Sequence, residues 1–118
     1  MGAITINGTS VDVRFTRGEK VAGLLRDIEV PLRCVRAVAV EPDGLQAARG
    51  VRAPGLAVPG MRKIGTWRGK GFRTAVSVRR DQKALRLVLE DHRYSEILIG
   101  VADADHVASQ LRQAMASL

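Results

Sequence analysis

Cysteine and aromatic side chains are scarce in this chain of 118 residues, which contains one cysteine and four aromatic residues. A single cysteine, Cys34, cannot form an internal disulfide, so nothing in the sequence requires an oxidising compartment. Its neighbours in VPLRCVRAVAV are mostly apolar, and we expect a buried, inert thiol. No apolar run is long enough to span a bilayer and no secretory signal is evident at the start, so we expect a cytoplasmic protein.

Residues that carry catalysis or bind metals are equally few. The two histidines, His92 and His106, have no cysteine or carboxylate at the spacing of a zinc site. The glycine-rich stretch GTWRGKG, residues 65–71, differs from a nucleotide-binding loop, because three residues separate its first two glycines and a glycine follows Lys70. We therefore expect no enzyme, no bound metal and no cofactor.

Acidic residues are absent from residues 44–80, which contain nine arginines and lysines. The formal net charge of the whole chain is +7, so this third of the sequence holds all of the excess. In one interpretation the charge belongs to the solvated face of a sheet. In a second it binds an anionic group on a lipid, a peptide or a protein, and in a third it binds nucleic acid.

The first half of the chain has the patterns of strands and one short helix. AITIN and SVDVRFT alternate apolar and polar residues on either side of the turn sequence NGTS, which predicts a hairpin. TRGE at residues 16–19 matches a capping box and predicts a short helix near residues 17–25. DIEVP and RCVRAVAVE read as two strands separated around Pro31. Residues 42–60 have turn signals without a regular period, and we predict a long irregular connection there.

Strand patterns return after residue 61. RKIGTWR and FRTAVSVRR flank a glycine-rich turn, and in FRTAVSVRR we expect a wet face formed by Arg73, Ser77 and Arg79. Short connections join antiparallel neighbours most simply, so FRTAVSVRR, ALRLVLE and SEILIGV are predicted to form an antiparallel meander.

The end of the chain changes to a helical period. Apolar residues recur on one face after Asp103, a favourable N-cap residue, which predicts an amphipathic helix over about residues 104–117. Such a stripe has to pack on the sheet, so we expect one domain spanning residues 1–118.

Several stretches of the sequence resemble a group of small actinobacterial proteins of unknown function that have a bacterial pleckstrin-homology-like domain. The most specific are RGVRAPG and GTWRGKG, supported by LRLVLEDHRYSEILIGVAD. The resemblance implies an α+β, mainly β fold, in which an antiparallel barrel or split sheet of about seven or eight strands is capped by the C-terminal helix. It supplies no catalytic or ligand-binding residues.

The basic hairpin around GTWRGKG is the site that this sequence favours. We expect a non-catalytic binding or scaffold domain that captures an anionic protein, lipid headgroup or phosphate, with Trp67 adding apolar contact at the rim. Sequence-independent binding of nucleic acid, with Trp67 stacking on a base, is the alternative, and an edge strand would allow a homo-oligomer. The candidate anion-binding residues are Arg49, Arg52, Arg62, Lys63, Trp67, Arg68, Lys70 and Arg73.

Overall fold

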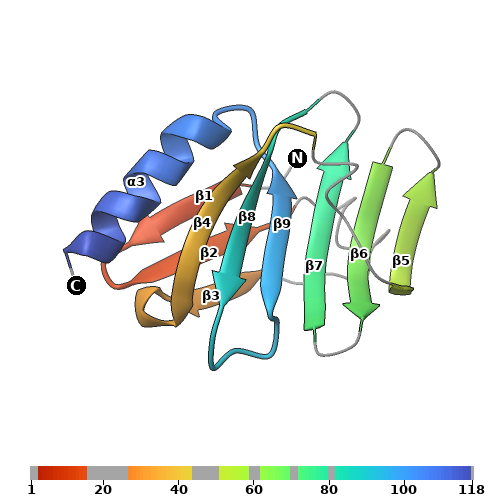
Figure 1. The fold of residues 1–118 in the computed structure, drawn as a ribbon, viewed down its shortest axis with the longest axis horizontal. Helices are drawn as coiled ribbons and strands as arrows, with labels where there is room; N and C mark the ends of the chain where they lie inside the picture. Colours follow the sequence, from red (N-terminus) through yellow and green to blue (C-terminus); the bar gives the residue numbers. More distant parts are fainter. Residues whose placement is uncertain are drawn as a thin grey trace.

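The protein forms two β-sheets and a C-terminal helix (Figure 1). The computed structural model describes residues 3–15, 27–43, 51–58, 62–69, 72–79 and 82–117. The first sheet has three strands, β1 (Ala3–Asn7), β2 (Ser10–Arg14) and β3 (Ile28–Pro31). The second has six, β4 (Val35–Glu41), β5 (Val51–Val58), β6 (Arg62–Gly69), β7 (Phe72–Arg79), β8 (Ala84–Leu89) and β9 (Glu96–Gly100).

The three-stranded sheet begins with the expected hairpin. β1 and β2 are antiparallel and Asn7 lies opposite Ser10, which leaves Gly8 and Thr9 as a two-residue turn. Gly8 has a φ of +59°, a value that a glycine adopts without the steric cost of a Cβ atom. β3 pairs with β2 and continues directly into the 3-10 helix η1 (Leu32–Cys34), which leads to β4 in the other sheet.

The hydrophobic core lies between the two sheets and the helix α3 (Ala104–Ala116). Each part of the fold supplies side chains that are fully buried: Val11, Val13 and Val30 from the first sheet, Leu85, Leu87, Ile97 and Ile99 from the second, and Leu111 from α3. Cys34 is buried in this core, as predicted from its apolar neighbours.

The six-stranded sheet has the order β4-β8-β9-β7-β6-β5, which corrects the predicted meander. β9 lies between β7 and β8, parallel to β7 and antiparallel to β8. All five residues of β9 are buried, and a strand that is covered on both faces is best placed inside a sheet. The short connection between β8 and β9 joins antiparallel neighbours as predicted, whereas the connection between β7 and β8 does not, because β9 lies between those two strands.

Two further expectations about the sheets need correction. The three-stranded and six-stranded sheets do not close into a barrel, and the described residues form nine strands where about seven or eight were expected. Residues 42–60 also contain the strand β5, which pairs with β6. The ladder shifts register between Ala53 and Gly55, at Pro54, where a proline without an N–H is tolerated.

The helix α3 confirms the C-terminal prediction. It covers residues 104–116, and Ala104, Ala108 and Leu111 form its buried stripe. Asp103 is its N-cap residue, although the Asp103 side chain makes no capping hydrogen bond. In Figure 1, α3 lies at the β4 end of the six-stranded sheet and β5 at the opposite end.

The predicted short helix near residues 17–25 lies outside the described residues. Within the described ranges, no helix has the length and apolar character needed to cross a bilayer.

Packing of α3 on the core can be tested by truncation. Leu111→Ala removes a side chain that is 0% exposed, so we expect the free energy of unfolding to fall by about 2–5 kcal/mol, measured by urea denaturation. Gln110→Ala on the exposed face of α3 is the control, and we expect it to change stability by less than about 0.5 kcal/mol. Equal effects of the two substitutions would contradict the packing described here.

Candidate anion-binding surface

β5, β6 and β7 form the cationic end of the six-stranded sheet. They contain six arginines and lysines and no acidic residue. The register places Arg68 opposite Arg73 at one end of the β6–β7 pair and Arg62 opposite Arg79 at the other. Like charges directly opposite each other in an antiparallel pair are unfavourable, so binding of an anion beside them would lower the electrostatic repulsion.

Arg73 and Arg79 are the cations of this surface whose side chains are described and unpaired. Arg73 is partly exposed and Arg79 is exposed, and neither guanidinium has a hydrogen bond or ion pair within the described ranges. The backbone of Arg73 is held firmly, because its N–H donates to Ser95 Oγ at 3.0 Å and its carbonyl accepts from the Ser95 N–H at 2.8 Å. This anchoring leaves the guanidinium available on a fixed backbone.

The other candidate cations either have only their backbone position described, already have a partner, or lie outside the described residues. Arg52 lies opposite Trp67 by register, on the row next to the one that joins Arg68 and Arg73. Lys63 is partly buried and already has an interaction within the chain, so it is not a free cation. Arg49 and Lys70 lie outside the described residues.

Trp67 does not form a rim of this surface, which corrects its expected role. Trp67 is 4% exposed and packs in a second hydrophobic cluster with Val76, Val78, Ala84 and Leu98. A buried indole cannot stack on a base or contact a partner without rearrangement, so Trp67 stabilises the sheet.

The solvated-sheet interpretation of β7 also fails in the middle of the strand. Ser77, expected on a wet face, is 2% exposed, while Val76 and Val78 on the opposite face are buried as well. The strand is therefore covered on both faces at its centre, and among residues 73–79, whose burial is described, only the two arginines reach solvent.

The sequence analysis missed a partly buried charge network on the neighbouring strands. Arg86 of β8 bonds Glu41 of β4 through Nε at 2.9 Å and Glu96 of β9 through Nη1. The side chains of Arg86 and Glu96 are 12% and 11% exposed. The alternation in ALRLVL places Arg86 away from the core face, but its two partners become visible only once the strand order is known.

Histidines and metal ligands give no second site. His92 accepts the Tyr94 N–H at Nδ1 (3.2 Å) and its ring stacks on that of Tyr94, while His106 is exposed on α3. Among the residues that the structure describes, no group of three or more histidine, cysteine, aspartate or glutamate side chains could hold a metal ion.

Comparison with known protein families, curated proteins and solved structures finds no match to this chain.

The charge network should stabilise the strand order β4-β8-β9. Arg86→Met removes the guanidinium and leaves two carboxylates close together, so we expect the free energy of unfolding to fall by about 3 kcal/mol. Arg36→Met is the matched control, because the Arg36–Glu90 pair is exposed, with side-chain exposures of 62% and 56%. We expect that control to cost less than about 1 kcal/mol in chemical denaturation. Similar losses in both variants would show that the network is no more stabilising than a surface ion pair.

Proposed function

We propose that this chain is a non-catalytic binding or scaffold domain whose β5–β6–β7 end contacts an anionic protein, lipid headgroup or phosphate group. The observation that supports the proposal is the pairing of Arg68 with Arg73 and of Arg62 with Arg79 in strands without any carboxylate. An anion bound beside two arginine positions that lie opposite each other lowers the repulsion between the like charges.

The spacing of the two arginine pairs favours an extended partner. Arg62 and Arg68 are six residues apart on one strand, which corresponds to about 20 Å at the rise of a β-strand. A single small anion can occupy one end only, whereas an acidic segment or an anionic membrane surface can contact both. Binding to both ends then benefits from a high effective concentration at the second.

Nucleic-acid binding is less well supported. It depended on Trp67 as a stacking platform, and that residue is 4% exposed. Phosphate contacts by the arginines alone would still produce sequence-independent, salt-sensitive binding, which an experiment can separate from protein or lipid binding.

Kinship with the actinobacterial pleckstrin-homology-like proteins remains part of this proposal and depends on the stretches RGVRAPG and GTWRGKG. Two sheets packed with one C-terminal helix are compatible with it in outline. The parallel pairing of β7 with β9 departs from the antiparallel order that the resemblance implies.

Charge reversal at Arg73 and Arg79 tests the proposed surface. We expect Arg73→Glu/Arg79→Glu to weaken binding to a poly-glutamate peptide and to phosphatidylcholine vesicles containing phosphatidylserine by about tenfold or more, which corresponds to roughly 1.4 kcal/mol. Binding is measured by titration calorimetry for the peptide and by co-sedimentation for the vesicles, with pure phosphatidylcholine as the blank. Circular dichroism establishes that the variant is folded.

The matched control is Arg14→Glu/Arg93→Glu, which lowers the net charge by the same amount at exposed arginines of β2 and of the β8–β9 turn. Equal weakening in both double variants would show an effect of net charge alone and would contradict a defined surface. Binding of unrelated oligonucleotides at physiological salt, in preference to peptide and vesicles, would support the nucleic-acid alternative instead.

The outer edge of β5 is where we propose self-association. Within the described strands β5 pairs with β6 alone, so the other side of its backbone can pair with a second copy. The opposite edge strand, β4, is contacted by α3, and Arg112 Nη2 donates to the Val38 carbonyl at 2.8 Å.

We expect a concentration-dependent dimer in sedimentation velocity, with salt favouring it because screening lowers repulsion between the cationic ends. A monomer at every protein and salt concentration would contradict this mode of assembly.

A further inference from the structure

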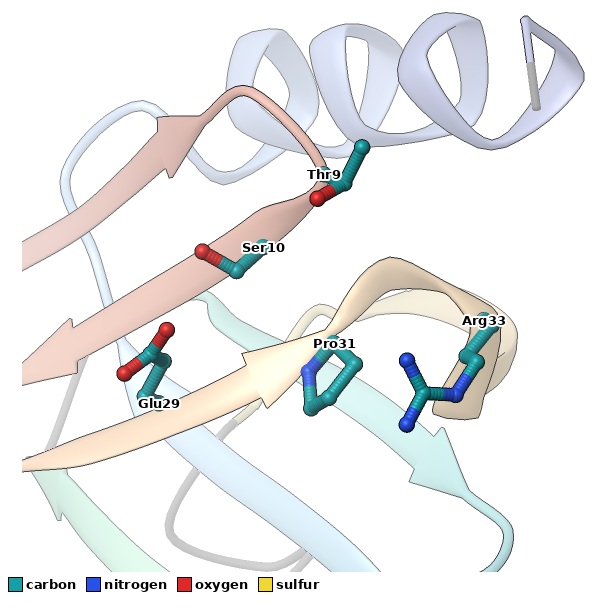
Figure 2. A pocket seen from close by; sticks show the side chains of 5 residues that line it. All are labelled: Thr9, Ser10, Glu29, Pro31 and Arg33. Carbon is teal, nitrogen blue, oxygen red and sulfur yellow. The ribbon is translucent and has the colours of Figure 1, made fainter.

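A hollow of about 490 Å³ lies on the three-stranded sheet, remote in sequence from the basic strands (Figure 2). It is lined by Thr9, Ser10, Glu29, Pro31 and Arg33. Its volume falls in the range of small-molecule sites, and its lining combines two opposite charges, two hydroxyls and one apolar ring.

The backbone of the hollow is well defined. Ser10 lies opposite Pro31 in the β2–β3 register, and the Leu32 N–H donates to the Thr9 carbonyl at 2.8 Å just beyond the last strand pair. Along β3 the side chains alternate, so Glu29 and Pro31 face outward while Ile28 and Val30 are directed into the core. The sheet therefore presents the lining residues on one fixed surface.

The two charges in this hollow do not neutralise each other. Glu29 and Arg33 are both exposed, and neither side chain has an ion pair or hydrogen bond with any part of the chain that the structure describes. Between them Pro31 has φ −58° and ψ 136°, and the chain then turns into η1. Figure 2 shows the Glu29 carboxylate and the Arg33 guanidinium separated by the Pro31 ring.

The Glu29 end of the hollow has two further carboxylates nearby, together with one cation, Arg14. Asp12 lies directly opposite Glu29 in the register, and a second hollow of about 350 Å³, lined in part by Asp12 and Asp27, shares Glu29 with the first. Adjacent carboxylates favour a cationic group at this end. The opposite end has the guanidinium of Arg33, whose planar fork suits a carboxylate.

From this arrangement we infer that the hollow binds a small zwitterion with an ammonium group at Glu29 and a carboxylate at Arg33. The Pro31 ring contacts the apolar body of the ligand between the two charges. The Thr9 hydroxyl has no hydrogen bond among the described residues, and Ser10 Oγ donates to the Asn7 carbonyl at 3.3 Å and can still accept one. Free amino acids and short peptides share this chemistry. The inference is independent of the proposed anion-binding surface.

NMR titration of the labelled protein tests the site and separates the two sources. The probes are leucine, alanyl-leucine, N-acetyl-alanyl-leucine and alanyl-leucine amide. We expect saturable shifts of the Thr9, Glu29 and Arg33 resonances with a zwitterionic probe, and affinity at least tenfold lower when either end is blocked. Tighter binding of leucine or of the dipeptide identifies a free amino acid or a peptide as the natural class.

Variants assign each charge to one end of the ligand. We expect Glu29→Gln to weaken binding of the unblocked dipeptide, and N-acetylation of the dipeptide then to cause no further loss of affinity. We expect Arg33→Gln to weaken the same binding, and amidation of the dipeptide then to cause no further loss. Glu90→Gln and Arg93→Gln make the same chemical changes at exposed residues outside the hollow and should leave binding unchanged. Shifts that do not saturate, equal binding of blocked and unblocked peptides, or normal binding by the Glu29 and Arg33 variants would overturn the inference.

Discussion

The position of β9 between β7 and β8 is the constraint on which the rest of the structure depends. β9 is five residues long and buried throughout, so it has to be hydrogen-bonded and covered on both sides. Its insertion brings Glu96 beside Arg86 and places β7, β6 and β5 beyond it, away from the helix. The same insertion prevents the simple antiparallel order that short connections would otherwise produce.

Charge is distributed along this strand order. The carboxylates of β4 and β9 meet Arg86 of β8, whereas β5, β6 and β7 have cations only. Cations at the β5 end therefore have no acidic neighbours within their own strands, and Arg73 and Arg79 remain available to an external anion. On the three-stranded sheet, Pro31 keeps Glu29 and Arg33 apart, which leaves a negative and a positive group on one small surface.

The sequence located the cationic strands correctly, but it did not show which of their residues are exposed and which are buried. Alternation along β7 places Arg73 on the same face as Arg79, yet it cannot show that both faces of β7 are covered. Ser77 and Trp67 are both buried, and Trp67 packs against residues of three other strands, Val76, Ala84 and Leu98 among them. The partners of Arg86 could not be predicted from the sequence either, because they are 45 and 10 residues away from it in the chain.

Local patterns alone determined the hairpin of β1 and β2, the C-terminal helix and the concentration of positive charge, because turn residues, helical periodicity and composition act over a few neighbouring residues. Only the tertiary structure decided that β9 enters between β7 and β8, that residues 51–58 become a strand despite Pro54, and that the sheets stay open. Those outcomes depend on which segments, distant in the sequence, pack against one another. The residues next to a position in the sequence do not determine that packing.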